Sequence, residues 1–497
     1  MSNNPETKGL SSFDFFTIGF GAIVGVGWAL SLNNWMANSG GPIPAAIGYL
    51  MVLVILTPVA LCYCELTPML PVAGGGMAFA YRAFNETVSF ISGWAAFGAF
   101  VSIIPWEAIQ ITDVLGYLIP NIKAGDPLYQ IAGTDVYLVT IIIGTICSLL
   151  LFALNMRGLA AAATLQKVLC FVLVGAGIVG AIASLVGGNA SNWQPIYEVT
   201  DPSIYGPASE GLKEVSHSSM FGGMMAILAS APFFLAGFET IPQGVEDAGG
   251  DITNVGKTVV MSVVLACIFY AILLICFGYA WPWKEFAHME NPSAATVFTF
   301  LYPGVAGEVL YWLITIGAIA GLFTTWNGFF MASASLLMGM GRGYLVPHIF
   351  AKQNKNGIPV PGLLVCLILS LIGPFLGAGL IGDITSFSAA AFVLSWTITS
   401  YSLIRLRKTE PDLPRPYKIP GGIAMGGFSA IVTTVVFILL FVPNNPVYMG
   451  KTASLMFVGW MVIGVILYLV SAVQRNKTTK EERRAAMFSH ANANTEA

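Results

Sequence analysis

The stretch Gly19-Phe-Gly-Ala-Ile-Val-Gly-Val-Gly27-Trp28 lies inside a long hydrophobic segment and holds four glycines in nine residues. In a helix interior each glycine is less favourable than alanine by about 1 kcal/mol. A helix within a bilayer has no water to satisfy the backbone groups that a break releases, so a break is tolerated only where it lines a cavity. We therefore predict two half-helices joined by a short unwound piece.

A second stretch, Ala231-Pro-Phe-Phe-Leu-Ala-Gly237-Phe238-Glu239-Thr240-Ile-Pro242, puts two prolines, a glycine and a carboxylate into one hydrophobic segment. The two stretches fall in the first and sixth hydrophobic segments of the chain. Interrupted segments in corresponding positions of two halves point to the binding site of a transporter. The alternative is that the glycines only allow helices to pack closely.

The composition is that of an integral membrane protein. Of 497 residues, 56% are hydrophobic and 9% are charged, against about 25% charged in soluble domains. A helix needs roughly 20 mostly apolar residues to cross a bilayer. Twelve segments meet this requirement: 13–39, 43–68, 90–119, 134–154, 163–187, 220–245, 257–281, 306–340, 360–378, 381–404, 422–442 and 452–473.

The positive charges define an orientation. With twelve crossings and the N-terminus inside, 18 of the 22 Lys and Arg residues face the cytoplasm, and only Lys123, Lys213, Lys284 and Lys451 lie outside. This distribution follows the positive-inside rule. We expect a multi-pass protein of the cell membrane with a cytoplasmic lead (1–12) and tail (474–497). The seven cysteines all fall within predicted spans, so we expect free thiols.

The fold expected is all-α. Residues 13–187 and 220–404 form two five-helix units, which have opposite orientation because five is odd, and residues 422–473 add two helices. Freed amides at the start of a half-helix suit a carboxylate, and freed carbonyls suit an ammonium group or a cation. Such a site fits a zwitterion.

Five stretches resemble the amino acid-polyamine-organocation (APC) transporter superfamily. They begin with Gly21-Ala-Ile-Val-Gly25-Val-Gly27, and continue with 64–84, 233–247, 332–359 and 405–420, the last containing Arg415-Pro-Tyr-Lys-Ile-Pro420. The resemblance covers nearly the whole chain. It implies a leucine-transporter-like fold of five plus five inverted helices, with secondary-active uptake or exchange of amino acids and amines by alternating access.

The resemblance also implies a substrate site. The substrate carboxylate would contact the backbone of Val24, Gly25, Val26 and Gly27. The region that faces the amine would comprise Ala22, Phe233, Phe234, Leu235 and the break at Gly237, with Phe238 as an aromatic lid. In the alternative interpretation, the phenylalanines are ordinary core or lipid-facing residues.

Glu107 lies deep in the third span, where a charge costs roughly 2.5 to 3.5 kcal/mol unless it is compensated. It is interpreted as a counter-charge for a substrate ammonium group or as a proton carrier. The alternative is a hydrogen-bonded carboxyl that fixes the kink at Pro105. Glu239 follows the second break and is a candidate gate residue together with Phe238.

The coupling ion is left open between Na⁺, H⁺ and exchange. Gly321, Thr324 and Thr325 share one helical face and resemble half of a sodium site, which carbonyls of Gly21 and Val24 would complete. Threonines in membrane helices also commonly bond their own backbone. Some proton-coupled relatives place a lysine in the fifth span, where this chain has Leu173.

Other function classes find less support in the sequence. It predicts no metal site, cofactor or nucleic-acid partner, and it has no phosphate-binding loop for ATP. A membrane enzyme would need a catalytic pair, and Asp383 has no evident partner. A sensor that binds an amino acid without moving it shares every site residue, so only a flux measurement separates it from a transporter. The oligomeric state is not defined.

Overall fold

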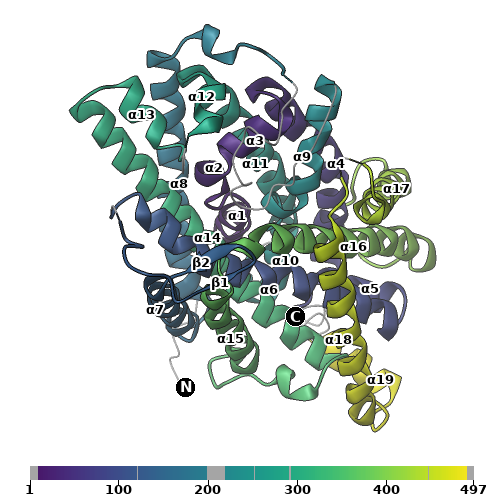
Figure 1. Ribbon diagram of the computed structural model, residues 1–497. Helices are drawn as coiled ribbons and strands as arrows, with labels where there is room; N and C mark the ends of the chain where they lie inside the picture. The colour runs from purple at the N-terminus through teal and green to yellow at the C-terminus, as the bar shows by residue number, and fades with distance from the viewer. Residues whose placement is uncertain are drawn as a thin grey trace, which may run out of the picture.

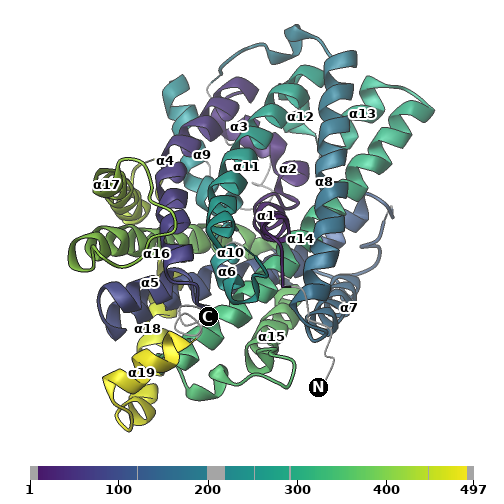
Figure 2. The same cartoon turned by 180° about the vertical axis from the view of Figure 1, so that it is seen from behind.

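The computed structural model describes residues 9–119, 121–198, 219–250, 252–289, 293–445 and 447–489. This part of the chain is almost entirely helical (Figures 1 and 2). Its strands are β1 (Tyr129–Ile131) and β2 (Thr134–Val136), which pair as one antiparallel hairpin. The predicted all-α class is confirmed.

Ten described helical segments are long and apolar enough to cross a membrane. One is the N-terminal segment Ser12–Leu30, which contains α1 (Ser12–Ile23) and α2 (Gly27–Leu30). The others correspond to α4 (Pro42–Met69), α6 (Glu86–Gly116), α7 (Leu138–Asn155), α8 (Leu159–Gly187), α11 (Ile252–Ala280), α14 (Val305–Arg342), α16 (Ile381–Thr409), α17 (Gly422–Phe441) and α18 (Lys451–Arg475). A shorter apolar helix is α15 (Val360–Leu376).

Shorter elements connect and extend these helices. They are α3 (Leu32–Ser39), α5 (Gly76–Ala83), α9 (Met220–Phe234), α10 (Thr240–Gln243), α12 (Trp283–His288), α13 (Thr296–Leu301) and α19 (Lys480–Met487), with 3-10 turns at Ala190–Trp193, Val245–Asp247, His348–Ala351 and Ala378–Leu380. Most boundaries agree with the predicted spans to within a few residues. The fourth differs in kind at its start, because residues 134–136 belong to β2 and the helix begins only at Leu138.

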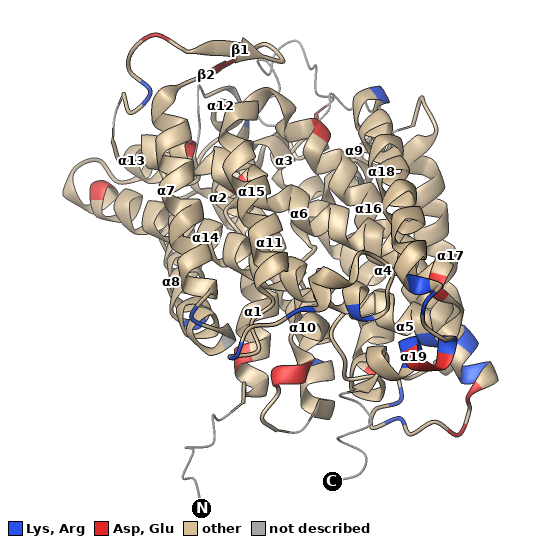
Figure 3. Cartoon of the chain, turned by 90° about the horizontal axis from the view of Figure 1, so that it is seen from below, with Lys and Arg blue, Asp and Glu red and all other residues tan. Residues whose placement is uncertain are grey.

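The outer surface matches a lipid environment. Large apolar side chains point outward from the peripheral helices, with Val186 77% and Val473 65% exposed. In Figure 3 the charged residues gather toward the ends of the helices, with most of the basic ones at the end that holds α5 and α19. Because exposed apolar side chains are stable against hydrocarbon, the uncharged band is the membrane-embedded part. The seven cysteines are free thiols, as expected.

Both predicted breaks are confirmed. The first crossing leaves helical geometry at residues 24–26, between α1 and α2. The second predicted break occupies residues 235–239, between α9 and α10, and Gly237 adopts a φ of 138°. A residue with a Cβ rarely adopts such a backbone conformation, so glycine is required there.

The end of the molecule that carries α5 and α19 is closed by ion pairs. Arg342 binds Glu246 at 2.6 Å, and the backbone N–H of Ala73 donates to the same carboxylate at 2.9 Å. Arg407 binds the buried Glu65. The contacts of Glu246 hold the segment after α10 against α14 and the segment before α5, and the Arg407–Glu65 pair joins α16 to α4.

The helix α19 docks across this end of the molecule. Its Arg483 is 6% exposed, contacts Glu86 at 2.8 Å and donates to the carbonyl of Arg475 at 2.6 Å. Met487 and Phe488 are buried beside it. The C-terminal segment is therefore an integral part of the closed face.

Candidate functional site

The second break touches the last turn of α1, directly before the first break. An ideal Cβ on Gly237 would lie 2.6 Å from the backbone N of Ile23 and 2.7 Å from the carbonyl carbon of Ala22. Ordinary contacts between such atoms are about 3.5 to 4.0 Å. Gly237 therefore permits an approach to the end of α1 that no other residue would allow.

Two backbone N–H groups at the first break are available to bind a ligand. Within the described part of the chain, the N–H groups of Val26 and Gly27 donate no hydrogen bond. They stand at the start of α2, where the helix dipole favours negative charge. This is the chemistry that holds a carboxylate.

At the second break, more of the backbone groups have hydrogen-bond partners. The N–H of Gly237 donates to Oε2 of Glu239 at 2.8 Å, and the hydroxyl of Thr240 donates to the carbonyl of Gly237 at 2.6 Å. Trp396 Nε1 donates to the other carboxylate oxygen of Glu239. Glu239 thus turns back onto its own break, where it fixes the unwound backbone.

A small cavity of about 20 Å³ lies where the breaks meet α6 and α14. Its lining residues are Ala22, Ile23, Gly25, Ile103, Trp106, Glu107, Phe233, Phe234, Thr325 and Phe329. A cavity of this size holds about one water molecule. The side chains around it must therefore move apart before a larger solute fits, so the structure represents a closed conformation.

Glu107 is the charged residue of this lining. It is 2% exposed, and its Oε2 atom has no hydrogen-bond partner within the described part of the chain. Gln110, one turn further along α6, is fully buried and both of its amide atoms lack partners there. A buried polar group without a partner costs about 1 to 3 kcal/mol. A ligand, a water molecule or, for the carboxyl, a proton that reaches the group would offset this cost.

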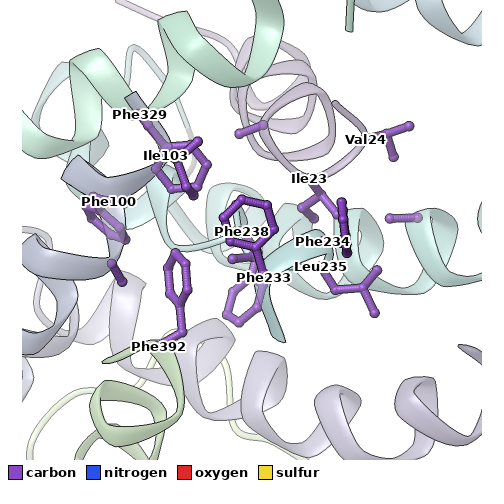
Figure 4. Packing of buried hydrophobic residues seen from close by; sticks show 14 of the residues in the cluster. Ile23, Val24, Phe100, Ile103, Phe233, Phe234, Leu235, Phe238, Phe329 and Phe392 are labelled. Atoms are coloured by element: carbon purple, nitrogen blue, oxygen red, sulfur yellow. The ribbon is translucent and has the colours of Figure 1, made fainter. Parts of the chain in front are cut away.

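Four of the other lining residues are aromatic: Trp106, Phe233, Phe234 and Phe329. Phe233 packs on Trp106 with ring centroids 5.5 Å apart, and Phe234 packs edge-on against Trp35 at 5.0 Å. Figure 4 shows Phe233 and Phe238 beside the break, with Phe329 nearby. Aromatic faces bind apolar groups and also attract ammonium groups.

The comparison with protein families now identifies the chain. A family model described as "Amino acid permease" matches residues 10–467. The chain belongs to the amino acid permease family. This family lies within the APC superfamily, so the resemblance recognised in the sequence is confirmed.

Relatives of this permease carry transporter names. The chain is similar to the branched-chain amino acid permease BcaP of Bacillus subtilis, with 23% identity over 94% of each chain. It is 24% identical to the protein of the same name in Lactococcus lactis, over 94% of this chain and 95% of the relative. The aspartate-proton symporter of Bacillus subtilis is 24% identical over 86% of this chain and 78% of its own length.

The structure brings together part of the predicted substrate set. Ala22, Gly25, Glu107, Phe233 and Phe234 line the cavity. The other predicted residues lie behind this lining, all fully or almost fully buried: Val24, Val26, Gly27, Leu235, Gly237 and Phe238.

Phe238, the predicted lid, stacks on Trp396 at 5.6 Å and meets Tyr63 edge-on at 5.5 Å. It also lies outside the cavity lining. In this closed conformation its ring packs into the core. Phe238 therefore becomes a lid only if this packing is released.

The candidate cation ligands of the permease are hydrogen-bonded to one another. Thr324 Oγ1 donates to the carbonyl of Gly321 at 2.7 Å, and Thr325 Oγ1 donates to the carbonyl of Gly21 at 3.5 Å. Leu173 lies beside Gly321, with its Cδ1 atom 3.2 Å from the position of an ideal Cβ there. Thr325 therefore meets Gly21 across α14 and α1, whereas Thr324 bonds its own helix; the cation site stays a prediction.

Tyr270 is a functional candidate that the sequence did not reveal. Its hydroxyl on α11 lies 2.9 Å from the carbonyl of Ile23 and 3.3 Å from the carbonyl of Phe234, so it bridges both breaks. The partners are 247 and 36 residues away in sequence. No local pattern could have signalled this contact, because a single tyrosine in an apolar span is usually a packing residue.

Proposed function

We propose that this permease is a secondary-active transporter that moves an amino acid or a related amine by alternating access. The observation that carries the proposal is the contact of two broken crossings beside a closed cavity that contains one unpaired carboxyl group. A transporter needs a site in mid-membrane with polar groups that water does not satisfy. The carboxyl of Glu107 gives this cavity such a polar group.

The proposed fold has twelve crossings. It adds α15 and the interrupted α9–α10 segment to the ten long helical segments. Residues 13–187 and 220–404 would be inverted five-helix units, followed by two helices in 422–473, with both termini in the cytoplasm. The appearance of one break in each unit supports this arrangement, because matching interruptions are typical of inverted repeats.

In the proposed binding mode, the substrate carboxylate accepts hydrogen bonds from the N–H groups of Val26 and Gly27. The ammonium group faces Glu107. The substrate side chain lies among Trp106, Phe233 and Phe234, which favours an apolar side chain. The relatives named branched-chain amino acid permeases support the same choice.

Alternating access would use the closed ends of the molecule. The Arg342–Glu246 contact closes the end that carries α5 and α19. Opening inward requires the inner half-helices α1 and α10 to move away from α14, whereas opening outward requires α3 and α9 to move. Glu239 keeps the second break intact during either movement, since it binds both Gly237 and Trp396.

The test is a flux measurement on purified protein in liposomes. Tritiated leucine, glutamate, arginine and putrescine are offered with an inward sodium gradient, an inward proton gradient, or internal substrate for exchange. The proposal expects saturable uptake of at least one of them, above the level of protein-free liposomes. Saturable binding without flux under every gradient would instead indicate a sensor. The absence of both binding and flux would refute the proposal.

A further inference from the structure

An open groove of about 600 Å³ runs between α4 and α17. Figures 1 and 2 show α17 at the edge of the molecule, beside α4. The groove is lined by Gly421, directly before α17, and by Ala424, Met425 and Phe428, whose spacing places them on one face of that helix. Binding sites for small ligands have volumes of about 300 to 1,000 Å³. The groove is therefore large enough to hold a ligand.

The groove faces the lipid. Both helices are long and apolar enough to cross a membrane, and Val54 and Phe428 in the lining are 63% and 46% exposed. The side chains of the lining are apolar apart from Thr57, whose hydroxyl donates to the carbonyl of Leu53 in its own helix. In a bilayer the molecule that reaches such a surface is a lipid, and an acyl chain matches its apolar lining.

Charged residues stand at one mouth of the groove. Glu65 follows the lining residue Leu61 by about one turn of α4. The backbone N–H of Ile419 donates to Oε2 of Glu65 at 2.9 Å, two residues before the lining begins at Gly421. Both walls of the groove therefore start next to the carboxylate of Glu65.

Two arginines share this one carboxylate. Arg407 donates two hydrogen bonds to Glu65, and Nε of Arg415 lies 3.4 Å from Oε1 of Glu65. The side chain of Glu65 is fully buried, and those of Arg407 and Arg415 are 19% and 4% exposed. Within the described part of the chain, neither arginine forms an ion pair with a second carboxylate. One positive charge is therefore left unbalanced in a poorly hydrated place, which is unfavourable unless an anion approaches.

Part of this positive charge lies at the start of α17. Nη1 of Arg407, which does not bind Glu65, is 2.5 Å from the position of an ideal Cβ on Gly422. Gly422 thus leaves room for the guanidinium group next to the lining residue Gly421. Lys418, three residues before Gly421, is exposed and adds a second positive charge at this mouth.

We propose that the groove between α4 and α17 binds an anionic phospholipid. The phosphate lies between Arg407 and Lys418, and one acyl chain fills the groove toward Phe428. The net charge of such a lipid balances the surplus arginine, whereas a zwitterionic lipid already balances its phosphate with its own ammonium group. The groove shares no lining residue with the cavity beside the breaks, so the inference does not depend on the transport function.

The first test is thermal unfolding of the purified, delipidated protein in detergent. It is titrated with dioleoylphosphatidylglycerol or dioleoylphosphatidylcholine, which have the same acyl chains and differ in headgroup charge. We expect phosphatidylglycerol to raise the melting temperature saturably and phosphatidylcholine to raise it less at every concentration. Inorganic phosphate should have no effect, because it lacks the chain. Equal rises with both lipids would show unspecific lipid contact and overturn the proposal, as would a rise with phosphate alone.

The variant Lys418→Gln tests the headgroup contact. One basic residue near an anionic headgroup contributes a factor of about five in affinity, so half-saturation by phosphatidylglycerol should need about five times more lipid. The matched control is Lys352→Gln, which removes an exposed lysine directly after the turn His348–Ala351. It should keep the native value. An unchanged Lys418→Gln, or an equal change in both variants, contradicts the headgroup contact.

The variant Ala424→Trp tests the acyl-chain contact, because its ring fills the groove. The control Ile431→Trp puts the same ring at a position of α17 that is 64% exposed and outside the lining. We expect Ala424→Trp to lose the difference between the two lipids and Ile431→Trp to keep it. A native response in Ala424→Trp, or the same loss in Ile431→Trp, overturns the proposal. These measurements need no transport, so they decide the lipid site even if the proposed function fails.

Discussion

Replacing Gly237 with alanine tests the contact between the two breaks. The new Cβ would lie 2.6 Å from the N atom of Ile23, whereas ordinary contacts are about 3.5 to 4.0 Å. The second break and the end of α1 must therefore separate by roughly 1 Å, which is enough to break one hydrogen bond to a substrate held beside them. In addition, a φ of 138° is strained by about 1 to 3 kcal/mol for a residue with a side chain.

We therefore expect Gly237→Ala to lower kcat/KM for uptake by about tenfold, the loss of one hydrogen bond, and to lower the free energy of unfolding. The assay compares initial uptake rates in liposomes with thermal unfolding of the same preparation. Gly459→Ala is the matched control, because an ideal Cβ on Gly459 in α18 meets no atom within 4 Å. Alanine there should leave uptake unchanged and stabilise the helix by up to about 1 kcal/mol. Native uptake and stability in Gly237→Ala would refute the reasoning.

Three further variants probe separate parts of the structure. Glu107→Gln should raise the KM for an amine-bearing substrate by about ten- to a hundredfold, since a hydrogen bond to a charged group contributes about 1.5 to 3 kcal/mol; an unchanged KM and unchanged substrate preference would remove that role. Tyr270→Phe loses the bridge between the breaks and should raise KM about tenfold; it must leave the fold intact by circular dichroism, and native kinetics would disprove the bridge. Arg483→Ala should lower the free energy of unfolding by about 1 to 3 kcal/mol because Glu86 loses the nearest of its charged partners, while KM stays native; an unshifted melting curve would show that this contact of α19 adds no stability.

The positions of the breaks could be predicted from the sequence because their causes are local. Glycine and proline weaken a helix wherever it packs, so the clusters around Gly25 and Gly237 identify the interruptions directly. Glu107 could be singled out for a similar reason, since the cost of a carboxyl at bilayer depth depends on its position within one span.

The direction of individual side chains could not be predicted in this way. Phe238 and Phe233 occupy the same broken segment, yet only Phe233 lines the cavity, because Trp396 from α16 packs against Phe238. Glu239 stays a candidate gate residue, but its contact with the N–H of Gly237, two residues earlier, is not evident from the sequence. The two residues are close in sequence, but their contact depends on the backbone conformation of the break, which the sequence does not define.

The polar contacts of Tyr270 and Gln166 depend on tertiary structure alone. Each donates to a backbone carbonyl on a different helix, more than 30 residues away for Tyr270 and 158 residues away for Gln166. Periodicity within one span carries no information about such partners. The docking of α19 is hidden for the same reason, since its polar sequence resembles any solvated tail.

The central claim, that a solute is held where the two broken crossings meet, is tested most directly by a structure with the transported substrate bound. We predict that its carboxylate lies within about 3.2 Å of the N–H groups of Val26 and Gly27, with its amino group facing Glu107. Density for the substrate at any other place, with these N–H groups and Glu107 left unliganded, would contradict the claim.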